Sequence, residues 1–353
     1  MIEEHAPLRE QVHSPGGTSE ELRSDFVLER PDLPTQRRLS HVKPLRRAPD
    51  IVFLGDGDEV ANLREAHARN ATSRLVPSQV AWDPRSKRYW TFAARLCHNR
   101  RMPVEILGPR QIEAMRHAGR IAAETLAFVG SQLHVGMSTG DIDRLVREDT
   151  ARRGGKPSQL GYKGFPAAVC TSRNNVVCHG IPRANDTIES GDIINVDVTT
   201  NVNGFHGDTS ATFIIGQASD EARRLVDIAR RCRDAGIAVI REGARLGDIG
   251  AAIQELAKFE GVSVVREFGG HGIGRHMHAE PHVSHTGRRG TGRRLQSGMA
   301  LTVEPMINLG AAAIRLLDDG WTVVTADGSL SAQWEHTVVV TRDGCEVVTL
   351  PFA

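Results

Sequence analysis

The sequence predicts an α+β domain made of two related halves that share one sheet, with helices outside. An internal repeat is the first observation: GxxxGDI begins at residues 136 and 243, and SGDIINVD and SGMALTVE begin at residues 190 and 297, so both pairs are offset by 107 residues. The same offset at two separate places indicates a duplication. The second observation is that each half places helical patterns before β-branched runs. We therefore expect a functional site between the halves.

The individual elements follow from the spacing of apolar residues. Apolar side chains recur at helical spacing from Ile112 to Val129 and from Leu225 to Val239. A second helix is predicted after each GDI sequence, at residues 142–146 and 249–256. Apolar or β-branched runs bounded by glycine then predict strands, at 193–198, 211–215, 299–303 and 337–341.

Composition sets broad limits on function. The 353 residues, of which 40% are hydrophobic, suffice for one large domain or two ordinary ones. The 44 basic and 43 acidic residues nearly cancel, so net charge favours neither a nucleic acid nor a membrane as partner. The sequence contains no run of about 18 apolar residues, the length needed to span a bilayer. Its first residues lack the profile of a secretory signal. The five cysteines form no CxxC pair, which indicates a reduced, cytoplasmic chain.

The chain changes character along its length. Residues 1–50 hold six of the 16 prolines and few apolar side chains, which predicts a mobile extension. Residues 51–105 form a segment of unknown fold that is rich in basic and aromatic residues, interleaved most densely at 82–101. The regular globular pattern begins at about residue 106, so we assign the two-half domain to residues 106–353.

Four carboxylates stand in apolar strand contexts where a charge is unexpected: Asp197, Asp208, Glu304 and Glu335. Burial of an unpaired carboxylate costs several kcal/mol or forces it to hold a proton. One such residue alone would more often be a satisfied polar group of the core. Four of them, with Asp197 and Glu304 at equivalent repeat positions, instead predict one site in which cations offset their repulsion. A pair of divalent metal ions would do so directly.

Three histidines are candidates for the same site. His271 lies between glycines in GGHGIG, where close approach to a ligand is possible, and it would supply a nitrogen ligand. Oxygen-rich ligation without thiolate favours Mn²⁺, Fe²⁺ or Co²⁺ over a structural zinc site. His179 and His278 stand beside glycine and proline turns. They are either ordinary surface imidazoles or donors to a reacting carbonyl group. Cys178 is interpreted as a small buried residue.

Six short motifs, in their order and spacing, carry a family resemblance: CHGIP at 178–182, NVDVT at 195–199, GDTS at 207–210, GHGIG at 270–274, TVEPM at 302–306 and EHT at 335–337. Residues from about 108 to 351 resemble the methionine aminopeptidases of type I. The resemblance implies the pita-bread fold, whose two pseudo-symmetric halves agree with the repeat. Only ~25 residues separate His278 from Glu304, a loop-scale connection. The type II branch of the family carries a long helical insertion there, so the resemblance indicates type I.

The resemblance also implies a role for each site residue. Asp197 would ligate one divalent metal ion and His271 and Glu304 the other, with Asp208 and Glu335 bridging both; the ions would be cobalt, manganese or iron. Glu304 would also shuttle a proton, His278 would stabilise the oxyanion, and His179 would orient the scissile amide or the departing amine. The pocket for the methionine side chain would be lined by Tyr162, Phe165, Cys170, Met277 and Trp321. Met277 stands where relatives often have an aromatic residue, and Gln159 where they often have cysteine.

The activity that the resemblance implies is hydrolytic removal of the N-terminal methionine from nascent proteins whose second residue is small. Such an enzyme would gain from proximity to the ribosome. Residues 82–101 would therefore either contact the ribosome or pack as a helix or loop on the catalytic domain with solvated charges. We expect a monomer that does not interact with membranes.

Two alternatives share the fold. A pita-bread peptidase that cleaves Xaa-Pro bonds would keep the same five ligands. It would usually carry a large folded N-terminal domain and would differ around CHGIP and GHGIG. A pita-bread protein that has lost catalysis and acts as a binding module would lack one or more of the five ligands. All five residues are present here.

Overall fold

The structure is a computed structural model, and it describes residues 104–351. The predicted mobile extension at 1–50, nearly all of the segment at 51–105, and the predicted ribosome contact at 82–101 lie outside the described residues. Within residues 104–351, no helix is both long enough and apolar enough to cross a membrane.

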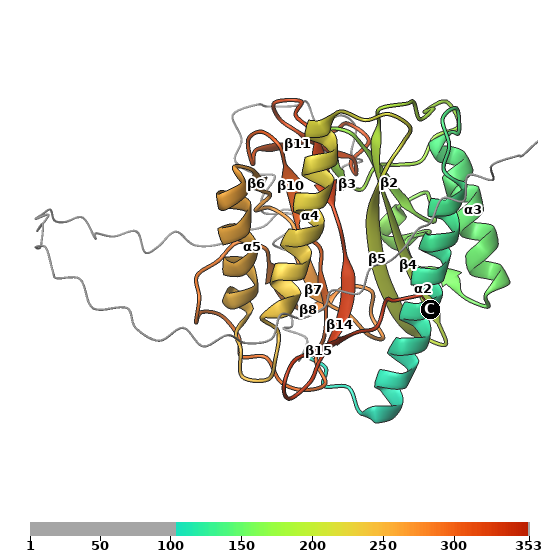
Figure 1. Cartoon of the computed structure of the whole chain (residues 1–353). Coiled ribbons are helices and arrows are strands. Elements are labelled where there is room, and N and C mark those ends of the chain that lie inside the picture. Colours follow the sequence, from blue (N-terminus) through green and yellow to red (C-terminus); the bar gives the residue numbers. More distant parts are fainter. Residues whose placement is uncertain (1–103, 352–353) are drawn as a thin grey trace, which may run out of the picture. The chain divides into compact units, whose positions relative to one another are not determined.

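Two helices open the first half, as the periodicity predicted: α2 (Pro109–Gln132) and α3 (Thr139–Arg152). Proline occupies the first turn of α2, where its missing N–H has no helical partner to lose. Ser138 begins α3 with a capping box, because its hydroxyl accepts from the N–H of Asp141 while the Asp141 carboxylate accepts from the N–H of Ser138. Both helices lie on the right of Figure 1.

The strands of the first half form an antiparallel sheet in the order β1-β4-β2, with β5 also paired to β4. Two strands dominate it, because β4 (Ile193–Val202) and β5 (Phe205–Ile214) form a hairpin of ten residue pairs. The short elements around them are β1 (Lys156–Pro157), the 3-10 turn η1 (Tyr162–Gly164), β2 (Cys170–Arg173) and β3 (Val176–Cys178).

The second half repeats the plan with α4 (Asp220–Ala238) and α5 (Leu246–Glu260). Its sheet has the order β15-β14-β9-β7-β8, formed by β7 (Gly269–Gly272), β8 (Ala279–Ser284), β9 (Ala300–Val303), β14 (His336–Val340) and β15 (Cys345–Val347). Two smaller three-stranded sheets contain β6 (Ser263–Val264), β10 (Met306–Asn308), β11 (Ile314–Leu316), β12 (Val323–Thr325) and β13 (Ser331–Gln333).

The sheets of the two halves meet where β5 runs beside β14. The N–H of Glu335 donates to the carbonyl of Ser210 at 3.0 Å. One step along, the N–H of Asp208 donates to the Thr337 hydroxyl at 3.1 Å, and that hydroxyl donates back to the Asp208 carbonyl at 2.8 Å. The helices lie outside this shared surface (Figure 1). The predicted α+β arrangement of two pseudo-symmetric halves is confirmed.

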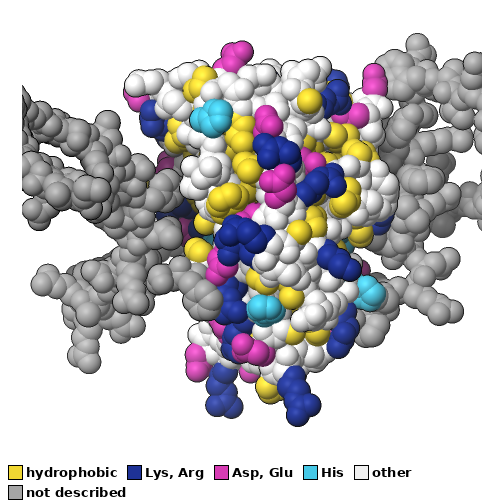
Figure 2. Space-filling view, turned by 90° about the vertical axis from the view of Figure 1, so that its right-hand side faces the viewer, with side chains coloured by type: hydrophobic (Ala, Val, Ile, Leu, Met, Phe, Trp, Pro, Cys, Tyr) yellow, Lys and Arg dark blue, Asp and Glu magenta, His cyan; other side chains and the backbone are white. Residues whose placement is uncertain are grey.

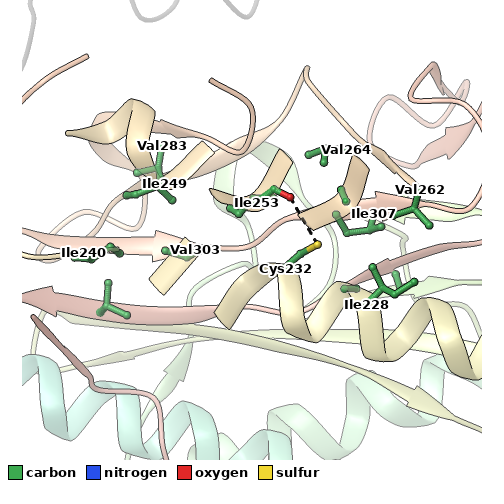
Figure 3. Close-up of a cluster of buried hydrophobic side chains, with 14 of the residues drawn as sticks. Ile228, Cys232, Ile240, Ile249, Ile253, Val262, Val264, Val283, Val303 and Ile307 are labelled. Atoms are coloured by element: carbon green, nitrogen blue, oxygen red, sulfur yellow. Dashed lines mark hydrogen bonds between the residues drawn. The ribbon is translucent and has the colours of Figure 1, made fainter. Parts of the chain in front are cut away.

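The larger hydrophobic core lies between α4, α5 and the strands of the second half. Figure 3 shows Ile228, Cys232 and Ile253 among its side chains, where the Cys232 thiol donates to the Ile253 carbonyl at 3.9 Å. A separate core under α2 and α3 contains Ile142, Val196 and Val198. A hydrophobic core therefore packs against the strands of each half. This packing fixes the positions of the polar residues where the two halves meet.

The surface over α2 and α3 carries charges of both signs. Figure 2 shows Lys and Arg side chains interspersed with Asp and Glu on this face. Several of them pair along the helices, such as Arg147 with Asp143 at 2.6 Å and Arg116 with Glu113 at 2.8 Å. This face therefore presents no extended field of one sign.

Candidate metal centre

The hairpin of β4 and β5 brings two carboxylates to one face of the first sheet. Asp197 lies opposite Ser210, and Asp208 stands two residues before Ser210 on the same strand. Since alternate residues of a strand share a face, both side chains project to the same side. The carboxyl groups of Asp197 and Asp208 are hydrogen-bonded to each other. The Thr199 hydroxyl donates to Asp208 Oδ1 at 2.7 Å and fixes that carboxylate.

The second half supplies the other acidic residues from the ends of paired strands. Glu304 follows the last residue of β9, and Glu335 precedes the first residue of β14. The Thr302 hydroxyl donates to Glu304 Oε1 at 2.7 Å and accepts from the N–H of His271 at 2.9 Å. One threonine therefore fixes both Glu304 and the strand that carries His271.

Glycines allow His271 to reach this site from β7. A Cβ on Gly270 would lie 2.2 Å from the Thr302 carbonyl oxygen, and one on Gly272 would lie 2.1 Å from the Glu280 carbonyl oxygen, so neither position admits a side chain. His271 Nε2 lies 3.5 Å from Glu304 Oε1 and 3.8 Å from Asp208 Oδ2. The sequence interpretation of GGHGIG as a segment of close approach is thus supported by the geometry.

The donor set fits a divalent cation. One ligand atom each from Asp208, His271 and Glu335 lies within 4.8 Å of the other two. His271 Nδ1 lies 3.1 Å from the Gly272 carbonyl and, as the donor there, leaves the lone pair on Nε2 directed at the carboxylates. Glu335 Oε1 is buried without a hydrogen-bond partner. A buried acceptor with no donor is costly, and a cation would satisfy it.

The electrostatics agree with this interpretation. Burial raises the pKa of Asp208 to about 7, and burial together with the charge of Asp208 raises the pKa of Glu304 to about 8. Burial and neighbouring carboxylates raise the pKa values of Asp197 and Glu335 well above their ordinary range. Burial lowers the pKa of His271 to about 4, which keeps its imidazole neutral. The site holds too much negative charge to be stable at neutral pH without protons or metal ions.

Two further histidines flank the centre. The ring of His278 lies 4.2 Å from that of His271 and 5.0 Å from that of Tyr162. His179 has a positive φ of 55°, which is uncommon outside glycine and is associated with functional sites. Burial lowers the pKa of His179 to about 4, so this ring is also neutral near pH 7.

Two of the five residues predicted to line a methionine pocket, Tyr162 and Trp321, have ring contacts with these histidines. Phe165 and Cys170 belong to one buried apolar cluster, and Trp321 packs against it. The rings of Phe165 and Trp321 are 5.1 Å apart, and Trp321 lies 6.3 Å from the ring of His179. Tyr162 stands beside His278. Met277 is buried, but it does not belong to this cluster.

Several supporting residues were not predicted from the sequence. Gln333 donates to Glu304 Oε2 at 3.2 Å, and Thr199 and Thr302 donate to carboxylates as described. Each is two residues from a predicted ligand, a spacing that places both on one face of a strand and could have identified them. His285 accepts from the N–H of Gly270 at 3.3 Å and from that of Glu304 at 3.2 Å. No local pattern indicated His285, because both of its partners are distant in sequence.

The fold and the candidate metal ligands are those expected of a metallopeptidase, and comparison with known proteins agrees with this class. The model of Metallopeptidase family M24 matches residues 113–342. A prolidase structure from Pyrococcus furiosus superimposes with a TM-score of 0.56 at 17% identity, covering 70% of this chain and 66% of that one, which shows a shared fold alone.

More similar relatives narrow the class. Methionine aminopeptidase A of Synechocystis is 47% identical over 247 residues, which cover 70% of this chain and 98% of the relative. The methionine aminopeptidase of Escherichia coli is 48% identical over 250 residues, covering 70% and 95%. The crystal structure of methionine aminopeptidase from Rickettsia prowazekii has a TM-score of 0.69 at 45% identity and covers 70% of this chain and 100% of that one. The chain belongs to the methionine aminopeptidases of metallopeptidase family M24, and the predicted pita-bread fold is confirmed.

Proposed function

We propose that this chain hydrolyses the first peptide bond of polypeptides that begin with a free methionine and continue with a small residue. The observation that carries the proposal is the junction of the two halves, where buried carboxylates and a neutral imidazole surround one point. Relatives named methionine aminopeptidase, at 47–48% identity over nearly their whole length, support the choice of substrate.

The centre would hold two divalent ions, cobalt, manganese or iron. Asp197 would ligate one ion, His271 and Glu304 the other, and Asp208 and Glu335 both. The predominance of oxygen donors with one nitrogen and no thiolate supports these metals. When bound, the ions would polarise the substrate carbonyl and make a water molecule nucleophilic near neutral pH.

The residues around the centre would manage protons and charge. The Glu304 carboxylate, which bound cations would keep ionised despite its burial, would accept a proton from the attacking water and pass it to the departing amine. His278, beside His271, would donate a hydrogen bond to the developing oxyanion. His179, packed against Trp321, would orient the scissile amide.

Substrate selection would follow from the neighbouring apolar cluster. Phe165, Cys170 and Trp321 offer sulfur and aromatic surfaces suited to an unbranched thioether. A free amine would be required if it sits beside the carboxylates, so formyl-methionine should resist cleavage until it is deformylated. Nascent chains are the natural substrates of such a site. Contact of the full-length chain with ribosomes, proposed for residues 82–101, would show as salt-sensitive co-sedimentation.

A peptide panel tests the proposal. Met-Ala-Ser, norleucine-Ala-Ser, Leu-Ala-Ser, Ala-Pro-Ser and a Met-Xaa-Ser series would be incubated with the Mn²⁺-loaded full chain, and the released residue measured. We expect release of methionine and norleucine ahead of leucine, only before a small second residue, with loss of activity on chelation. Similar rates for many first residues, or ready cleavage of Met-Lys and Met-Trp bonds, would contradict the methionine-specific function. Preferential release from Ala-Pro-Ser would favour the Xaa-Pro alternative.

A further inference from the structure

The side chain of Gln159 completes the edge of β4 where β1 ends. β1 pairs with β4 only at Lys156 and Pro157, and the N–H of Ser158 then donates to the Thr199 carbonyl at 2.8 Å. Beyond that point the Gln159 side chain takes over. Its Oε1 accepts from the N–H of Thr199 at 3.1 Å, and its Nε2 donates to the Asp197 carbonyl at 2.8 Å. The side-chain amide thus replaces the backbone of a neighbouring strand.

The same amide reaches the Asp197 carboxylate. Gln159 Nε2 lies 3.5 Å from Asp197 Oδ1, and the Asp197 carboxyl group is also hydrogen-bonded to Asp208. An amide nitrogen carries two hydrogens, so one can serve the Asp197 carbonyl and the other can point at Oδ1. Gln159 itself is 6% exposed, so water does not compete freely for these contacts.

Gln159 also anchors the turn that carries Tyr162. The Gln159 carbonyl accepts from the N–H of Tyr162 at 2.9 Å, and the next turn is closed by Gly161, whose φ is +79°. The ring of Tyr162 lies 5.0 Å from that of His278. One residue therefore connects Asp197, through its side chain, with the aromatic ring beside His278, through its backbone.

We propose that Gln159 is a positioning residue that fixes the Asp197 carboxylate for metal binding. It also fixes the position of that carboxylate relative to Tyr162. This inference rests on the proposed function, because it concerns the proposed ligand Asp197. Partners that orient a metal ligand typically affect metal affinity by 10- to 100-fold when they are removed. The side-chain amide holds Asp197 by both its carbonyl and its carboxylate, so loss of the amide should weaken the Asp197 side of the centre first.

The test is titration of the metal-free full chain with Mn²⁺ by calorimetry. Gln159→Met keeps the length of the side chain but removes its donor and acceptor, and we expect ~10- to 100-fold weaker Mn²⁺ binding. Gln159→Asn keeps the amide on a shorter stem and should weaken binding in the same direction, so it provides the measurement if the methionine variant does not fold. The Tyr162 hydrogen bond uses the Gln159 backbone and persists, so kcat on Met-Ala-Ser should fall more than KM rises.

Asn201→Ala is the matched control. Asn201 lies on the same strand opposite β1, and its side chain contacts His206 Nε2 at 2.9 Å and the N–H of Gly204 at 3.2 Å, away from Asp197. We expect this variant to unfold more easily while its Mn²⁺ affinity stays within ~3-fold of the wild type, below the range for removal of a ligand's partner. Wild-type affinity in a folded Gln159 variant, or an equal loss in Asn201→Ala, would overturn the inference. Absence of Mn²⁺ binding by the wild type would instead refute the proposed metal centre itself.

Discussion

The two halves of the domain share the same order of helices and strands, but their paired strands differ in length. In the first half, β4 and β5 are ten-residue strands joined by the tight turn at Asn203 and Gly204, both of which have positive φ. In the second half, the paired strands β9 and β14 are shorter, and the chain between them forms β10 to β13. Both halves deliver carboxylates to the junction, and both contribute to the apolar cluster beside it, Phe165 and Cys170 from the first half and Trp321 from the chain between β9 and β14 in the second.

The two halves also present their carboxylates from different parts of their strands. The hairpin supplies Asp197 and Asp208 as a rigid pair on one face of a sheet. The second half places Glu304 and Glu335 at strand ends, on either side of the chain that forms β10 to β13. We therefore expect the repeat-equivalent residues Asp197 and Glu304 to share a metal-binding role and to differ in catalysis.

The largest expected loss of activity comes from removing the carboxylate that each half is proposed to contribute to both metal ions. Asp208→Asn in the first half and Glu335→Gln in the second remove the two proposed bridging carboxylates. Each should lower turnover of Met-Ala-Ser by more than the ~100-fold upper range for residues that only orient a ligand. Asp192→Asn is the control, because Asp192 lies one residue before β4 but contacts Arg173 and Asn174 instead of the centre. Full activity of Asp208→Asn in metal-free buffer would refute the shared role.

The next prediction concerns Glu304, which is expected to have a role in proton transfer that its counterpart Asp197 lacks. Glu304→Gln removes a proposed ligand and the proposed proton shuttle, so turnover at saturating Mn²⁺ should fall by at least ~10²-fold, the low end for acid–base catalysis. Asp197→Asn, at the equivalent repeat position, removes only a proposed ligand. Excess Mn²⁺ should therefore restore Asp197→Asn more fully than Glu304→Gln. Equal recovery of the two variants would mean that Glu304 has no additional role.

A third prediction follows from the raised pKa values of the carboxyl groups. In the metal-free protein the pKa values of Asp208 and Glu304 are about 7 and about 8, above those of the unfolded chain. From about pH 7 to 8 these carboxyl groups therefore hold protons in the native state that they have released in the unfolded chain, and their effect is that the free energy of unfolding falls as pH rises. The buried histidines act in the opposite direction, because their pKa values are lowered in the native state while the unfolded imidazoles are about half protonated at pH 6.5; this opposition fades as pH rises above about 7.

Thermal unfolding at several pH values measures this effect. The midpoint of the metal-free chain should fall between pH 7 and 8, and added Mn²⁺ should abolish the decline by replacing the protons. Asp208→Asn should show a shallower decline than the wild type. A midpoint that rises over this interval without metal would show that these carboxyl groups are already ionised.

The smallest expected effect concerns the wall of the predicted methionine pocket. Met277 is flexible where relatives often have an aromatic ring, and it lies next to His278. Met277→Phe should improve discrimination of methionine from leucine severalfold, because differences of shape in an apolar site are worth only ~1–3 kcal/mol. The ratio of kcat/KM for Met-Ala-Ser and Leu-Ala-Ser measures it. An unchanged ratio would place Met277 outside the selecting surface.

The helices, the main strands and the grouping of carboxylates could be predicted because each has a local signature. Charges such as Asp197 and Glu335 stand out in apolar runs, and the repeat pairs Asp197 with Glu304. The contacts of Gln159 and His285 could not be predicted, because they join residues that are distant in sequence and depend on how strands pack. The three-residue strands between β9 and β14 are too short to establish a periodicity.

The metal content of the chain tests the central claim most directly. Equilibrium dialysis of the wild type against Mn²⁺, followed by elemental analysis, should find two ions per chain, and Asp192→Asn should retain both. Asp208→Asn should lose affinity for both ions together, since its carboxylate is proposed to ligate both. No bound metal in the wild type, or two tightly bound ions in Asp208→Asn, would contradict a centre built jointly by the two halves.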